Sequence, residues 1–204
     1  MSNNAILYGQ VLIDELTVGE YVANNGYWGN KYAVQVGAKS FDAFEIHHLF
    51  LQTELNVASP YTYSHLNPLK NYSHYNQSLT HPLGANFYEG IGIAEYSSGR
   101  FEYRLQANYA LFGADSSQTS SVGKDIFRSY DLRVHDYGNY IGQGIRTTLL
   151  YLDARLSYVL NPLNNLRFEA VCSYRSLAST IESSRSLLFS VGLRGSFRNI
   201  YYDF

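Results

Sequence analysis

The side chains best suited to chemistry are concentrated in residues 60–86, which read PYTYSHLNPLKNYSHYNQSLTHPLGAN. This stretch holds three of the six histidines, four tyrosines and three of the four prolines. The prolines interrupt any helix or strand ladder, so the stretch is predicted to be a loop. Loops this long are usually functional or disordered, and disordered segments are poor in aromatic residues. We therefore expect an ordered loop, either a cap packed on its own rings or a binding surface.

Histidines in this loop raise the question of a metal site. His65, His74 and His81 are side chains of a type that ligates zinc. Their spacings of nine and seven residues match no compact metal motif, so we expect no metal and predict hydrogen bonding within the loop instead. The single cysteine, Cys172, leaves no partner for an intrachain disulfide or for a cysteine-based zinc site.

Carboxylates on the predicted strands raise the question of hydrolysis, because glycosidases use a pair of them. The candidates are Asp14, Glu54, Glu89, Asp153 and Glu169. Each has Arg or Lys in its own row or a neighbouring one, so ion pairing is the better explanation. No nucleophile elbow, phosphate loop or HExxH helix occurs. The chain is predicted not to be an enzyme and to need no cofactor.

Saccharide binding is the chemistry that remains. Tyrosine rings supply flat apolar faces with a polar tip, and Asn, Gln and His supply donors and acceptors for sugar hydroxyls. The residues that we expect to contact a saccharide are Tyr63, His65, Asn71, Tyr72, His74, Tyr75, Asn76 and Gln77.

Composition narrows the class of protein. The net charge is −2, so there is no basic footprint for nucleic acid. Charged residues make up 16% of the chain, against about 25% in a typical soluble domain, and there are 20 tyrosines. This balance is typical of membrane barrels or sugar-binding surfaces. No run of about 18 apolar residues occurs, which argues against a transmembrane helix.

Alternation of apolar and polar residues predicts long strands and no helix. The predicted strands are residues 5–16, 31–41, 48–58, 87–96, 101–109, 147–160, 166–176 and 185–204. Most of them are about ten to twelve residues long, close to the 9–11 that a tilted membrane strand needs. In 87–96 the phase is ambiguous, since either Tyr88 and Gly90 or Ile91 and Ile93 could face outward. A phase slip predicts a bulge near Asn199.

Alternation alone does not distinguish a soluble barrel from a membrane barrel. The connections are alternately long and short: 17–30, 42–47, 60–86, 97–99, 113–146 and 161–165. Outer-membrane barrels have this pattern. Aromatic residues near strand ends fit an interfacial girdle, and Phe204 resembles the C-terminal signal read by the barrel assembly machinery. We predict an all-β, antiparallel transmembrane β-barrel domain over 1–204, in contact with outer-membrane lipid.

Three segments carry a family resemblance: AILYGQVLIDEL, NKYAVQVGAKSFDAF and PYTYSHLNPLKNYSHYNQSLTHPLGANFYEGIG. They resemble the C-terminal part of capsule-assembly Wzi-like outer-membrane proteins of gliding bacteria, some of which are called gliding motility protein RemB. The resemblance implies a larger barrel in the outer membrane of a Gram-negative bacterium. It also implies binding of capsular polysaccharide at the cell surface, in support of capsule attachment or gliding motility.

The chain departs from that family because it has no recognisable signal peptide and no N-terminal half, so we expect a C-terminal fragment or a truncated product. Eight strands can close as a small barrel. We expect them instead to be part of a larger one, since an open arc would expose two edges to lipid. Two other functions stay open: a passive outer-membrane channel, and a structural subunit of a motility or secretion assembly.

Overall fold

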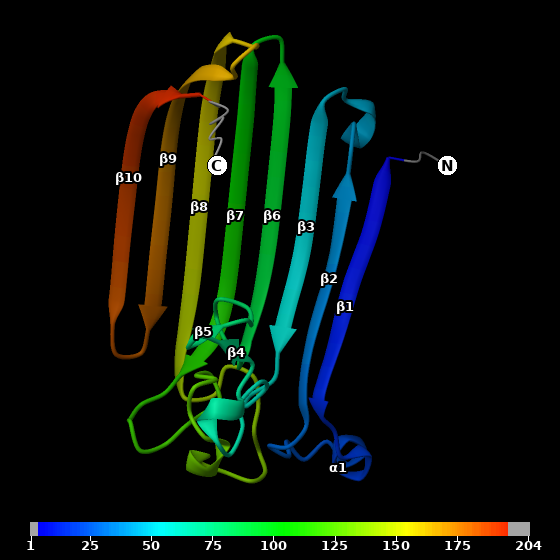
Figure 1. The fold of residues 1–204 in the computed structure, drawn as a ribbon, viewed down its shortest axis with the longest axis vertical. Coiled ribbons are helices and arrows are strands. Elements are labelled where there is room, and N and C mark those ends of the chain that lie inside the picture. The colour runs from blue at the N-terminus through cyan, green and yellow to red at the C-terminus, as the bar shows by residue number, and fades with distance from the viewer. Residues whose placement is uncertain (1–3, 196–204) are drawn as a thin grey trace, which may run out of the picture.

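The computed structural model describes residues 4–195 and consists mainly of one antiparallel sheet of eight strands in chain order (Figure 1). These strands are β1 (Ala5–Glu15), β2 (Lys31–Ser40), β3 (Leu49–Ala58), β6 (Phe87–Ser98), β7 (Phe101–Ala114), β8 (Ile145–Asn161), β9 (Leu166–Ser179) and β10 (Ser183–Arg194). The two-residue strands β4 (Ser73–His74) and β5 (Gln77–Ser78) form a separate hairpin. The all-β, antiparallel prediction is confirmed.

Short helical turns interrupt the connections. One of them, α1 (Val18–Ala23), corrects the prediction that 17–30 is entirely loop. It ends at Asn24, whose φ of 48° is the left-handed conformation common at helix C-termini. The 3₁₀ turns are η1 (Ala43–Glu45), η2 (Pro68–Lys70) and η3 (Tyr130–Leu132). No helix within residues 4–195 is long and apolar enough to cross a membrane.

The sheet is open in the part of the chain that the structure describes. Strands β1 and β10 are at its two edges and lie on opposite sides of the molecule (Figure 1). Neither edge has a second strand neighbour among residues 4–195. The predicted strand 185–204 corresponds to β10 as far as Arg194. The bulge predicted near Asn199 and the signal predicted at Phe204 lie outside the described residues.

One face of the sheet is apolar and exposed. The register aligns Val36 with Leu55, Leu55 with Gly90, and Gly90 with Tyr109. Large apolar side chains on this face are open to the surroundings: Leu55 is 64% exposed and Leu105 is 59% exposed. The same alternation continues across all eight strands, so the apolar face extends from one edge of the sheet to the other.

The register also settles the ambiguous phase of residues 87–96. Gly90 lies between Leu55 and Tyr109 on the apolar face. Ile91 and Ile93 therefore point to the opposite, polar face. That face carries the charged rows, in which Arg155 lies 3.9 Å from Asp153 and 3.8 Å from Glu169. The predicted ion pairing is present for these two carboxylates.

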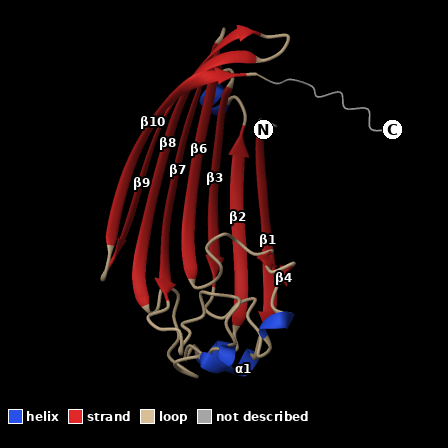
Figure 2. Cartoon of the chain, turned by 60° about the vertical axis from the view of Figure 1, so that its left-hand side comes forward, coloured by secondary structure: helices blue, strands red, loops and turns tan. Residues whose placement is uncertain are grey.

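All three long connections lie at one end of the sheet, and the turns that follow β2, β6 and β8 lie at the other (Figures 1 and 2). At the loop end the polar face gives way to a small apolar patch. Ala58 and Phe87 are 1% and 2% exposed there, and Ala85, Leu83 and Tyr63 pack on them. The loops therefore fold over the polar face and form a cap on this end.

Candidate functional site

Buried polar side chains hold the cap together. Asn86 is fully buried; its Nδ2 donates to the carbonyl oxygens of Gly113 at 3.2 Å and Gln143 at 3.0 Å. Its Oδ1 accepts the backbone N–H of Gly142 at 2.6 Å. One asparagine at the start of β6 thus connects the second long loop to the third, which satisfies backbone groups that burial would otherwise leave unpaired.

Lys31 connects all three long loops. This lysine at the start of β2 is 0% exposed, and its Nζ lies 3.1 Å from Glu15 Oε2 and 3.3 Å from the carbonyl oxygen of Ser64. The ammonium also lies over the rings of Tyr130, at 4.4 Å from the centroid, and Trp28, at 5.2 Å. Because a buried charge is costly without partners, these contacts explain how the lysine is tolerated.

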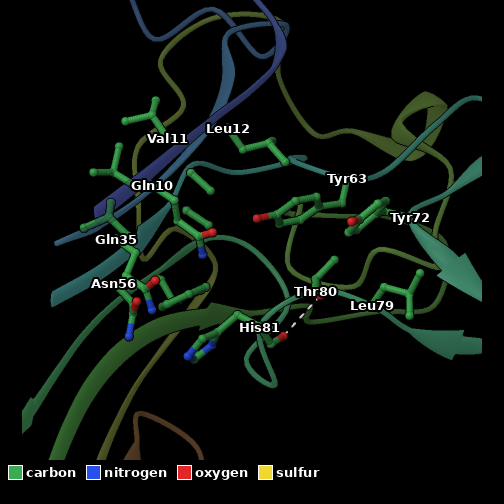
Figure 3. Close-up of a pocket in the computed structure, with 15 residues that line it drawn as sticks. Gln10, Val11, Leu12, Gln35, Asn56, Tyr63, Tyr72, Leu79, Thr80 and His81 are labelled. Carbon is green, nitrogen blue, oxygen red and sulfur yellow. Dashed lines mark hydrogen bonds between the residues drawn. The ribbon is translucent and has the colours of Figure 1, made fainter. Parts of the chain in front are cut away.

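Between the cap and the polar face of β1, β2 and β3 lies an open cavity of about 460 Å³ (Figure 3). Tyr63 and Tyr72 form its loop-side wall, with ring centroids 5.8 Å apart and ring planes 22° apart. Gln10, Gln35 and Asn56 line the strand side. Two flat rings opposite a row of amides can pack on the apolar face of a ligand while hydrogen bonding to its polar edge.

Backbone geometry positions both rings. Tyr63 has a φ of 70°, and its N–H donates to Asp14 Oδ2 at 3.0 Å. The N–H of Tyr72 donates to the Tyr63 carbonyl oxygen at 3.3 Å, which places the rings side by side. Burial raises the pKa of the Tyr63 phenol above its usual 10.0, so the hydroxyl keeps its proton at neutral pH and can donate. Tyr72 is 50% exposed and lies at the cavity opening.

Two carboxylates lie directly behind the strand side of the cavity. Glu54 accepts hydrogen bonds from the Tyr8 hydroxyl at 2.6 Å and from Gln35 Nε2 and Asn56 Nδ2, each at 2.9 Å. Glu89 accepts from Asn56 Nδ2 at 3.2 Å and from His81 Nε2 at 2.9 Å. The predicted pairing of these carboxylates with Arg or Lys is therefore wrong, because tyrosine, amide and histidine donors take that place.

Asp14 departs from the ion-pairing prediction in the same way. Its Oδ2 accepts the backbone N–H of Tyr63 rather than a cation, and within residues 4–195 no Lys or Arg lies within ion-pair distance of it. The carboxylate therefore serves to anchor the loop on β1.

Two of the eight residues predicted to contact a saccharide line the cavity. Tyr63 and Tyr72 line the cavity, and His65 does not. Asn71 is 7% exposed, and its Nδ2 donates to the Ile126 carbonyl oxygen at 3.3 Å, which makes it a cap contact. The others form the β4–β5 hairpin away from the cavity: His74, Tyr75, Asn76 and Gln77.

The hairpin itself has a local explanation. Tyr75 and Asn76 have φ values of 47° and 60°, as a two-residue type I′ turn requires. Tyr75 is 88% exposed, and the His74 ring lies 4.4 Å from it. His81 lies elsewhere, bonded to Glu89, and residues 4–195 contain no group of three His, Cys, Asp or Glu side chains placed to hold a metal ion.

Sequence reasoning missed the strand side of the cavity. Gln10, Gln35 and Asn56 are consecutive cross-strand partners on the polar face. Their parity and their closeness to the loop end of each strand were signals available in the sequence. His81 was recognised as a loop histidine but not as a cavity residue, because its contact with Glu89 depends on the folded path of the loop.

A smaller cavity of about 220 Å³ lies beside α1, with an aromatic lining. Tyr32 and Tyr88 reach it from strand ends, Tyr21 reaches it from α1, and Tyr27 and Tyr140 reach it from loops.

Comparisons of the chain with protein-family models, curated proteins and solved structures gave no match.

Proposed function

We propose that the sheet is part of the wall of an outer-membrane β-barrel, and that its capped end binds surface polysaccharide in support of capsule attachment or gliding motility. The observation that carries the proposal is the cavity at which the stacked rings of Tyr63 and Tyr72 meet the amide row of β1 to β3. The resemblance to Wzi-like proteins points to the same ligand class.

The two faces of the sheet support the membrane part of the proposal. Soluble proteins rarely expose contiguous apolar patches of more than a few hundred Å². Here an apolar face extends over eight strands, with Leu105 59% and Val191 74% exposed. Lipid is the solvent that suits this face, and a water-filled lumen suits the hydrogen-bonded opposite face. The edges of β1 and β10, which have no second strand neighbour among residues 4–195, need further strands in lipid, so we infer a larger barrel.

The placement of the three long loops at one end of the sheet supports the cell-surface part of the proposal. Outer-membrane barrels have short turns on the periplasmic side and long loops outside the cell. The three long loops of this chain share one end of the sheet (Figure 1), so the cap and its cavity face outward in this orientation.

The dimensions of the cavity suit part of a polymer chain. Small-molecule sites have volumes of about 300–1,000 Å³, and this one has about 460 Å³. Each ring contact with a sugar is weak, so affinity for a polymer comes from several subsites along it. We expect millimolar binding of short oligosaccharides, on the order of −4 kcal/mol, that strengthens with chain length.

A pair of tyrosine variants tests the proposal. Tyr72→Ala removes a ring from the cavity opening and should weaken binding about 2- to 13-fold, because an aromatic contact contributes about 0.5–1.5 kcal/mol beyond its burial. Tyr75→Ala removes an equally large ring outside the cavity and should leave binding unchanged. The measurement is affinity electrophoresis of refolded protein in gels containing surface polysaccharide extracted from the producing cells. Equal affinity of the two variants would refute saccharide binding in this cavity.

Deletion of residues 60–86 separates this function from a passive channel. The deletion should abolish polysaccharide retention, whereas a channel would conduct as well or better in planar bilayers without its cap. Retention that survives the deletion would place the ligand elsewhere.

A further inference from the structure

Two of the three amides on the strand side of the cavity donate to the carboxylates behind it. Asn56 Nδ2 donates to both Glu54 and Glu89, which uses both of its N–H groups. Gln35 Nε2 donates to Glu54 as well. Among residues 4–195, no donor reaches Gln35 Oε1 or Asn56 Oδ1. This side of the cavity therefore presents mainly acceptors to a ligand.

His81 is hydrogen-bonded to only one of the two carboxylates. Its Nε2 lies 2.9 Å from Glu89 Oε2, and its Nδ1 lies 3.2 Å from the backbone nitrogen of Leu83. Stacking on Phe87, with ring centroids 4.5 Å apart, holds the imidazole in this orientation. Glu54 accepts hydrogen bonds only from uncharged donors: the Tyr8 hydroxyl, Gln35 Nε2 and Asn56 Nδ2.

No other cation compensates the carboxylates. Within residues 4–195, neither Glu54 nor Glu89 has a Lys or Arg within ion-pair distance. Lys39 lies on the same face, and its Nζ lies over the Tyr8 ring at 5.2 Å from the centroid. The two negative charges, each one hydrogen bond behind a lining side chain, thus act on whatever occupies the cavity.

We propose that this cavity selects an amino sugar with a free ammonium group over neutral sugars, and neutral sugars over uronic acids. The inference rests on the proposed saccharide function and adds the ligand's chemistry to it. An ammonium or hydroxyl supplies the donors that the open acceptors lack. A carboxylate brings further acceptors and a like charge to a site that already holds two negative charges.

Three tetramers that share a β-1,4-linked backbone test the order: glucosamine, glucose and glucuronate. Binding is measured by titration calorimetry at low ionic strength in mildly acidic buffer. A unit charge about 6 Å from a carboxylate, at an effective dielectric constant of about 40, changes affinity about tenfold. We expect the glucosamine tetramer to bind about tenfold more tightly than the glucose tetramer, with the glucuronate tetramer weakest.

Glu89→Gln removes one charge but keeps an acceptor oxygen for His81. It should reduce the preference for the glucosamine tetramer over the glucose tetramer about tenfold, whereas Glu45→Gln, at an exposed position by the short turns, should leave that preference unchanged. Glu54→Gln gives the same comparison if trypsin sensitivity shows Glu89→Gln to be unfolded. If the glucuronate tetramer binds most tightly, or if these variants keep the wild-type preference, the inference is overturned but the proposed saccharide function is not. If the wild-type protein binds none of the three, the proposed function fails with it.

Discussion

Replacement of Lys31 by Met tests whether one buried ammonium holds the three long loops in a single cap. Methionine keeps an unbranched side chain of similar length, so the packing of the stem is retained while the charge is lost. The ammonium contacts that disappear are those with Glu15, the Ser64 carbonyl and the rings of Trp28 and Tyr130.

The expected cost follows from these contacts. A desolvated cation–π contact contributes about 2 kcal/mol, and a hydrogen bond to a charged group contributes about 1.5–3 kcal/mol. Glu15 is 46% exposed, so water solvates its carboxylate when the lysine is lost. Removal of a buried charge also recovers its desolvation cost. We expect the cap to lose about 2–4 kcal/mol, which raises its open population about 30- to 1,000-fold.

Limited proteolysis of the refolded protein in detergent measures the open population directly when reclosing is faster than cleavage. In Lys31→Met, cleavage within residues 60–86 and 115–144 should accelerate by that factor. The matched control is Lys70→Met, at an exposed position on η2, which should cleave at the wild-type rate. Equal cleavage of the two variants would refute the role of Lys31.

Two further outcomes test the assignment of the faces and the burial of the cap. Leu105→Arg, on the apolar face, should reduce the free energy of folding into lipid by about 2–4 kcal/mol if the residue lies near the bilayer midplane. Gln106→Arg, on the polar face, should cost much less. Equal penalties for the two variants in a refolding titration would contradict the membrane assignment. Burial raises the pKa of Tyr61 and Tyr63 above 10.0, so the folded cap retains their protons longer than the unfolded loop does. Stability of the cap should be constant below pH about 10 and decrease above it, as followed by protease resistance, and an unchanged resistance there would contradict their burial.

The strands were predictable because their signal is local. Alternation with period 2 identified all eight long strands, and each long strand pairs with the next long strand in the chain, as consecutive strands usually do. The phase of β6 was not predictable, since Gly90 and Gly92 carry no side chain to mark a face. Only its register between Leu55 and Tyr109 decides which side is apolar. The helix α1 has six residues, too few to display a 3.6-residue period.

The cap was less predictable because its contacts join distant segments. Asn86 bonds to Gly142 and Gln143, and the Tyr61 hydroxyl donates to the Ser121 carbonyl oxygen, 60 positions away. Aromatic content indicated an ordered loop but not which ring faces which neighbour. Tyr72 and Tyr75 are alike in the sequence. In the structure a type I′ turn directs Tyr75 away from the cavity that Tyr72 lines.

The cavity lies where the polar side chains on this face of the sheet give way to apolar ones. Gln10, Gln35 and Asn56 form one cross-strand row with Glu89, the last polar row before an apolar row that includes Ala58 and supports the cap. A register slip of one residue in any of these strands would turn its polar side chain to the opposite face. Strand pairing therefore sets the acceptor side of the site, whereas the loops set its aromatic wall. Variants that open the cap should consequently lose ligand binding while the sheet still inserts into lipid.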